Sequence, residues 1–223
     1  MSRFALFVAA SLMASSVAFA ADLSREQPQA QAPELQPAFN WSGWYLGGFG
    51  GFDAGQSAGN VYTYPSGPFT HSETGTFSGP FAGVNGGYDW LLGPHLLVGI
   101  GADVSADDIT SSTSTSKSQT TWGAGVAGRI GYATGRFLIY ADGGWHWSGG
   151  TATYLPHPET INTNSNGPTV GAGIEYAMTR HWTADFAYSH NFGTSTHTFP
   201  ASGFFTKITS NSDNFSIGAA YHF

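Results

Sequence analysis

From residue 41 onward, the chain repeats short stretches in which apolar side chains alternate with small or polar ones. The last ten residues, "NFSIGAAYHF", carry five apolar side chains in one phase: Phe215, Ile217, Ala219, Tyr221 and Phe223. Alternate residues of a β-strand point to opposite faces, so this segment predicts a strand with one apolar face. Chain ends of soluble domains are usually poorly ordered, so a strand that runs to a terminal aromatic residue needs a partner to hold it.

Seven earlier stretches repeat the alternation, at residues 43–53, 82–90, 96–105, 122–132, 137–147, 169–178 and 182–189. Glycine obscures the phase of the first stretch, where we place Trp44, Leu46 and Phe52 on the outer face and Asp53 on the inner one. Each stretch is close to the roughly 9–11 residues that a tilted strand needs to cross a bilayer. The pattern therefore predicts eight membrane-crossing strands.

The connections between these stretches alternate in length. Short ones lie at 91–95, 133–136 and 178–181, and long polar ones near 54–80, 106–120, 148–167 and 193–212. Short periplasmic turns and long extracellular loops are typical of outer-membrane barrels. An unpaired strand edge is costly in hydrocarbon, so the eighth strand should pair with the first. The predicted fold is all-β, an eight-stranded antiparallel transmembrane β-barrel over residues 41–223.

A soluble antiparallel barrel is the alternative fold, with the aromatic side chains in its core. It would have to expose its glycine-rich phase to water, where a polar face is expected. Aromatic residues make up 15% of the chain and charged residues 9%, against roughly 25% charge in ordinary soluble domains. Composition thus favours a protein that faces something other than water.

The N-terminal 40 residues lack the strand pattern. Residues 1–20 carry Arg3, an apolar run and the small-residue site Ala18-Phe19-Ala20, which predicts a cleaved secretory signal peptide. Residues 21–40 are rich in Pro, Gln and Ala and predict a flexible periplasmic lead-in. The chain has no cysteine and a net charge of −7, which excludes disulfides and thiolate chemistry and argues against a nucleic-acid partner.

Four motifs carry a resemblance to a known family: "WSGWYLGG" (41–48), "GRIGYATGRFLIYADGG" (128–144), "GPTVGAGIEYAMTRHWTADFAYSHNFG" (167–193) and the terminal "YHF". Together they resemble the small eight-stranded outer-membrane surface proteins of the OmpA-like, opacity-like and RopB-like class, often called the porin family. The resemblance implies a location in the outer membrane of a Gram-negative bacterium. It also implies a structural role in envelope integrity and a role as a surface antigen or in adhesion.

The resemblance further implies contact with outer-membrane lipid and lipopolysaccharide. The C-terminal strand looks like the signal that the outer-membrane assembly machinery recognises, carried here by Phe215, Ile217, Tyr221 and Phe223. The sequence departs from the family in two places. Pro168 stands where tryptophan is usual, and Asp185 and Ala187 stand where a basic residue and a glutamate are usual, so the charge pairing inside the barrel is expected to differ.

The inward phase collects most of the charge of the predicted strands: Asp89, Asp103, Arg129, Asp142, Glu175 and Asp185, with His146 and His222. The interior of an eight-stranded barrel is just wide enough for side chains to fill it. We therefore expect a structural network in which Arg129 bridges Asp142 on the adjacent strand and Glu175. Many inward glycines leave space, so a small, cation-preferring porin is the alternative function.

Catalysis is the third function class, as a lipid-modifying or proteolytic barrel, and we expect no enzyme. Ser189 and His190 point to opposite faces of their strand, whereas a nucleophile and its base must come within hydrogen-bond reach. Asp107 and Asp108 in the second long connection have no matching histidine pair.

We expect no cofactor and no metal site in the long connections. The spacing of His71, His157 and His197 does not require a metal, and isolated histidines are usually solvated. Phe204 and Phe205 are an apolar pair that could contact a surface partner or lipopolysaccharide, or pack on neighbouring loops.

Overall fold

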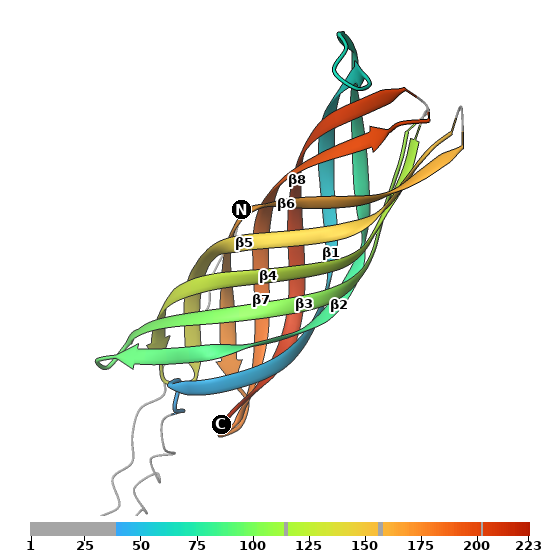
Figure 1. Ribbon diagram of the computed structural model, residues 1–223. Helices are drawn as coiled ribbons and strands as arrows, with labels where there is room; N and C mark the ends of the chain where they lie inside the picture. The colour runs from blue at the N-terminus through green and yellow to red at the C-terminus, as the bar shows by residue number, and fades with distance from the viewer. Residues whose placement is uncertain (1–38, 114–115, 156–157, 202) are drawn as a thin grey trace, which may run out of the picture. The chain divides into compact units, whose positions relative to one another are not determined.

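The computed structural model describes residues 39–113, 116–155, 158–201 and 203–223. These residues form eight antiparallel strands in a closed ring (Figure 1). The strands are β1 (Gly43–Thr63), β2 (Phe69–Leu92), β3 (Leu96–Ser112), β4 (Ser116–Thr134), β5 (Phe137–Tyr154), β6 (Glu159–Ala177), β7 (Trp182–Phe199) and β8 (Phe204–His222). The predicted signal peptide, and the lead-in up to residue 38, lie outside the described residues.

The ring closes between the first strand and the last, as the sequence predicts. Leu46 on β1 lies opposite Gly86 of β2 and opposite Tyr221 of β8, and β8 lies beside β1 in Figure 1. Closure gives each strand a paired neighbour on both sides in the half of the barrel nearer the short turns, which satisfies the backbone N–H and C=O groups there. In the long hairpins, residues 69–76 of β2 pair with β1 alone and residues 159–164 of β6 pair with β5 alone. None of the described residues forms a helix long and apolar enough to cross a membrane.

The strands are longer than the sequence pattern predicts. They run from 17 residues in β3 to 24 residues in β2, and most of each segment expected to be a long loop continues the strand pairing. β1 and β2, for example, stay in register up to the pair Tyr62↔Phe69. In these extensions neither face of the strand contacts lipid, so both faces carry polar residues and the apolar–polar alternation disappears. A segment rich in Ser, Thr and Asn is then predicted to be a loop from its composition, although its strand pairing continues.

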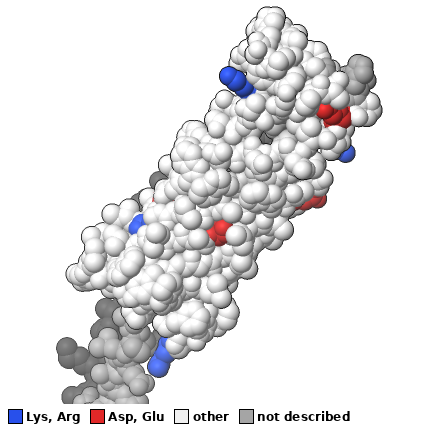
Figure 2. Space-filling view, viewed as in Figure 1, with Lys and Arg blue, Asp and Glu red and all other residues white. Residues whose placement is uncertain are grey.

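The outward phase forms an apolar belt in the half of the barrel nearer the short turns. The phase assigned to every strand is confirmed, including β1, where Trp44, Leu46 and Phe52 are exposed and Asp53 is buried. At the short-turn rim, the rings of Tyr221 and Phe223 lie 5.1 Å apart and His181 stacks on Tyr221. The face seen in Figure 2 carries few charged side chains, as a lipid-facing surface requires.

Aromatic side chains also cluster near the tips of the long hairpins. Phe205 stacks on Tyr62 with ring centroids 5.0 Å apart, and Phe204 lies 6.3 Å from the Tyr154 ring. Both phenylalanines are half-buried, so of the two sequence-based alternatives the structure shows packing against neighbouring hairpins.

Candidate functional site: a cup in the barrel lumen

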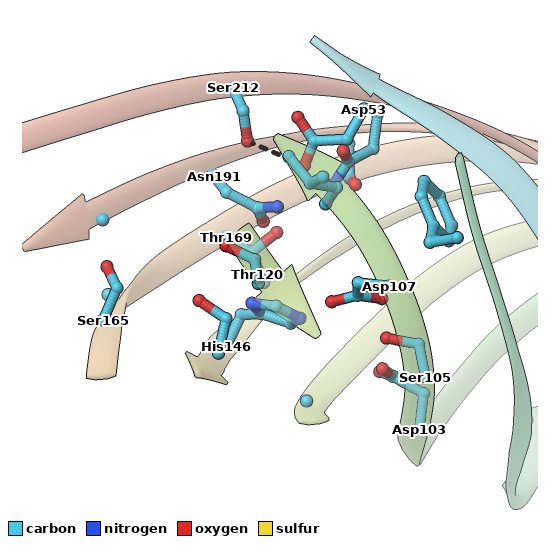
Figure 3. A pocket seen from close by; sticks show the side chains of 18 of the residues that line it. Asp53, Asp103, Ser105, Asp107, Thr120, His146, Ser165, Thr169, Asn191 and Ser212 are labelled. Atoms are coloured by element: carbon cyan, nitrogen blue, oxygen red, sulfur yellow. Dashed lines mark hydrogen bonds between the residues drawn. The ribbon is translucent and has the colours of Figure 1, made fainter. Parts of the chain in front are cut away.

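The lumen contains a cavity of about 390 Å³ that is lined by inward side chains of all eight strands. It extends from Tyr45, Arg129 and Tyr140, in the half near the short turns, to His197 and Ile208 in the long hairpins. Figure 3 shows polar side chains pointing into it from several strands. We call this cavity the cup, and the layer of charged side chains formed by Asp89, Arg129 and Glu175 its floor.

The floor is a compact network of buried charges. Nε and Nη2 of Arg129 donate to the two carboxylate oxygens of Asp89, with 2.9 Å for the Nε bond, and Nη1 donates to Glu175 Oε2 at 3.3 Å. The other oxygen of Glu175 lies 3.1 Å from His222 Nε2. The guanidinium carbon lies 4.6 Å from the centre of the Tyr45 ring. A bidentate Arg–carboxylate pair with a ring against its face is held in one orientation.

A hydrogen bond between Tyr140 of β5 and Asp185 of β7 lies next to the floor. Tyr140 Oη donates to Asp185 Oδ2 at 2.9 Å, and the Tyr140 ring centre lies 5.4 Å from the Arg129 guanidinium carbon. Tyr45 and Tyr140 both fall in the inward phase. Sequence reasoning named neither as a site residue, because it collected only the charged side chains and histidines of that phase.

The partner of Arg129 is set by a glycine. Asp89, Gly99 and Arg129 lie in one row across β2, β3 and β4. A Cβ atom at position 99 would collide with Asp89 Oδ1 and lie 3.1 Å from Arg129 Cγ. The missing side chain therefore leaves the space in which the two charged groups meet.

The expected bridge between Arg129 and Asp142 is wrong. Asp142 is opposite Arg129 in the β4–β5 register, but the ion pairs of Arg129 within the described chain go to Asp89 and Glu175. The space over Gly99 draws the guanidinium toward β2, away from β5. Asp142 instead lines the cup, while the expected contact between Arg129 and Glu175 is present.

An apolar layer lies at the short-turn end of the barrel. Trp41 is 2% exposed, and it clusters with Leu97 and Leu138, both 0% exposed, and with two alanines. Its indole Nε1 donates to the carbonyl of Gly135 at 3.3 Å. None of these residues lines the cup, and they form a buried apolar cluster at this end of the barrel.

The wall above the floor is acidic. Asp53, Asp103 and Asp107 line the cup together with His146 (Figure 3). A Cβ at Gly123 of β4 would lie 3.0 Å from His146 Nε2 and 3.1 Å from Asp107 Oδ2, so these two groups converge over that glycine.

The other wall carboxylates have different surroundings. Asp103 Oδ1 would lie 2.6 Å from a Cβ at Gly125, on the same strand as Gly123. Ser212 Oγ donates to Asp53 Oδ2 at 3.3 Å. Asp107, which the sequence placed in a loop, continues the inward phase of Asp103 along β3.

His197 lies at the mouth of the cup, in the part of β7 that extends beyond the outward apolar belt. Burial lowers the pKa of its imidazole to about 4. The side chain is therefore neutral at pH 7 and does not offset the negative charge of the wall.

The candidate catalytic pair is separated, as the sequence predicts. Ser189 lines the cup, whereas His190 faces outward and lies 2.8 Å from the exposed carboxylate of Asp213. Tyr188 Oη also donates to Asp213, at 2.6 Å. The outward group thus holds an acid and a histidine without Ser189.

Within the described residues, no group of three or more His, Cys, Asp or Glu side chains is arranged to hold a metal ion. His71 lies 3.1 Å from Glu73 at the hairpin formed by β1 and β2, and His197 lies in the cup. His157, the third histidine considered in the sequence, lies outside the described residues.

A closed eight-stranded barrel with an apolar outer belt and a polar lumen defines a small outer-membrane β-barrel protein. The chain belongs to the family of the outer membrane protein beta-barrel domain, whose model matches residues 6–223. The protein is therefore an outer-membrane protein.

Named relatives agree with this family. The 31 kDa outer-membrane immunogenic protein of Brucella melitensis is 29% identical over 201 residues, covering 79% of this chain and 81% of that protein. The 22 kDa outer membrane protein of Rhizobium leguminosarum is 28% identical over 195 residues, covering 86% and 83%. The outer membrane protein OprG of Pseudomonas aeruginosa has a similar fold, with a TM-score of 0.53 at 14% identity over 82% of this chain and 96% of its own.

Proposed function

We propose that the protein is a non-conducting surface barrel, which stabilises the outer membrane and presents its long hairpins as a surface antigen or adhesive surface, without catalysis. The closed floor is the observation that carries this proposal. Arg129, Asp89 and Glu175 fill the lumen at one level, and Trp41 and Leu138 pack beneath them. An ion would have to break a buried bidentate pair and displace packed apolar side chains to pass.

The surface role is supported by the length of the hairpins. β1 and β2 stay paired beyond the apolar belt up to the pair Tyr62↔Phe69, and Tyr62 stacks on Phe205 of β8. Paired, aromatic-packed hairpins present a defined surface to antibodies or other cells. One relative, from Brucella melitensis, is named an immunogenic protein.

Two contacts of the barrel are part of the proposal. Outer-membrane lipid and lipopolysaccharide surround the apolar belt, and the assembly machinery binds the C-terminal strand through Phe223 and its neighbours. Phe223 is 72% exposed, and Phe215 and Ile217 are exposed on the same face of β8, so this motif is accessible from outside the barrel.

The test is planar-bilayer conductance of the folded protein, with folding checked by the change in gel mobility on boiling. We expect no steady current from the wild-type barrel. Cation-selective openings from correctly folded protein would overturn the proposal in favour of the small porin. Arg129→Met serves as the comparison, because it removes the guanidinium but keeps side-chain volume in the floor. A conducting Arg129→Met variant beside a silent wild type would show that the floor seals the lumen.

A further inference from the structure

Three acceptor oxygens in the wall of the cup receive no hydrogen bond from any protein group among the described residues. They are Asp53 Oδ1, Asp107 Oδ1 and Asn214 Oδ1, each buried and each on a residue that lines the cup. Asp53 is 7% exposed as a whole. Buried polar groups are normally paired, so unpaired acceptors in one cavity mark a place where a donor is missing.

Asp53 and Asn214 lie directly opposite each other in the β1–β8 pair, so two acceptors face the same space. The amide of Asn214 can be turned to present its nitrogen instead. The two carboxylates have no such alternative, because an ionised carboxylate accepts hydrogen bonds but cannot donate them.

The protein supplies little positive charge to this part of the cup. Arg129 is bound to Asp89 and Glu175 at the floor. Asp185 has the Tyr140 hydroxyl as its donor. The imidazole of His146 lies near the wall, beside Asp107. Among the described residues that line the cup, Arg129 is the one Lys or Arg side chain, so no second one lies beside the acidic wall.

We propose that the cup binds a small organic amine through its ammonium group, with Asp53 and Asp107 as the accepting carboxylates. An ammonium group brings both the positive charge and the three N–H donors that the wall lacks. A directly chelated metal ion fits less well, because the described residues hold no group of metal ligands. The cavity of about 390 Å³ lies within the roughly 300–1,000 Å³ of small-molecule sites. This inference goes beyond the proposed surface role and does not depend on it.

The experiment is isothermal titration calorimetry of the detergent-solubilised, folded barrel with putrescine as the probe. We expect saturable binding of one putrescine per barrel, and none of 1,4-butanediol, which has the same chain but no charge. Physiological salt screens exposed charges over about 8 Å, so the titration is done at that salt concentration.

Asp107→Asn and Asp108→Asn form the matched pair of variants. The first removes a charge from the cup, and the second removes the same charge one residue further along β3, from the outer face, where Asp108 accepts from Gln119. We expect Asp107→Asn to weaken putrescine binding by about tenfold or more, the effect of losing a charge-assisted hydrogen bond. Asp108→Asn should bind as the wild type does. Asp53→Asn should weaken binding as Asp107→Asn does, and gives a second test if Asp107→Asn fails to fold.

Three results would overturn the proposal. One is absence of saturable binding to the folded wild type. Another is equal weakening by Asp107→Asn and Asp108→Asn, which would mean general attraction to a negative surface. The third is displacement of putrescine by equimolar Mg²⁺, which would make the cup a site for divalent cations.

Discussion

Replacement of Gly99 by alanine tests the account of the floor most directly. The added Cβ would collide with the Asp89 carboxylate and approach Arg129 Cγ to 3.1 Å. Asp89 is 0% exposed, so its carboxylate has no free space into which it can move. The two outcomes are that the Arg129–Asp89 pair breaks or that the strands shift.

The expected loss of unfolding free energy can be bounded by two known effects. Overpacking a filled interior costs about 1–3 kcal/mol, and breaking a buried ion pair costs about 3–5 kcal/mol. We therefore expect Gly99→Ala to lower the free energy of unfolding by about 3 kcal/mol. The measurement is urea unfolding of the barrel in lipid vesicles, followed by the shift in gel mobility.

Gly128→Ala is the control for this substitution. Gly128 precedes Arg129 on β4 and faces outward, and a Cβ there would meet its nearest atom, the Gly99 carbonyl oxygen, at 3.8 Å. Its effect should stay within about 0.5 kcal/mol. If Gly99→Ala costs less than about 1 kcal/mol, below the range for overpacking, the floor is not the close-packed network described above.

Three further predictions concern the two ends of the barrel. Trp41→Ala should lower the free energy of unfolding by about 3–5 kcal/mol, because Trp41 is 2% exposed and bonded to Gly135; unchanged urea unfolding would show that the apolar layer is dispensable. The chain has no cysteine, so Ser66→Cys in the β1–β2 hairpin should react with an impermeant maleimide on intact cells, whereas Thr134→Cys beside a short turn should not. Labelling in the reverse pattern would invert the proposed orientation. Phe223→Ala should reduce the amount of barrel assembled in cells but change unfolding by under about 1 kcal/mol, because the side chain is 72% exposed; normal assembly would contradict its role as a recognition signal.

The outward belt and most of the lumenal charges could be predicted from the sequence. Alternation has a period of two wherever one face is lipid-facing, so the phases of residues such as Asp89, Arg129 and Glu175 follow from their neighbours. The prediction failed where that contrast disappears. Asp107 lies beyond the belt, in a polar segment whose strand pairing gives no apolar signal.

The contacts within the floor could not be predicted in the same way. Asp142 is opposite Arg129, and nearest-neighbour reasoning selected it, yet Arg129 turns across Gly99 to Asp89. The contacts of Trp41 could not be predicted either, because it lies at the start of the predicted barrel but before β1, where alternation assigns it no face.

The sequence by itself determined the number of strands, their inner and outer faces and the acidic character of the lumen, because these are local properties of a two-residue repeat. Only the tertiary structure decided which charges meet, that the Trp41 layer backs the charged floor and that Asp53 and Asp107 retain unpaired oxygens in one cup. Those features depend on the register between strands and on the space left by single glycines such as Gly99. Strand register and packing space depend on which distant segments lie side by side, so they cannot be deduced from any single segment of the chain.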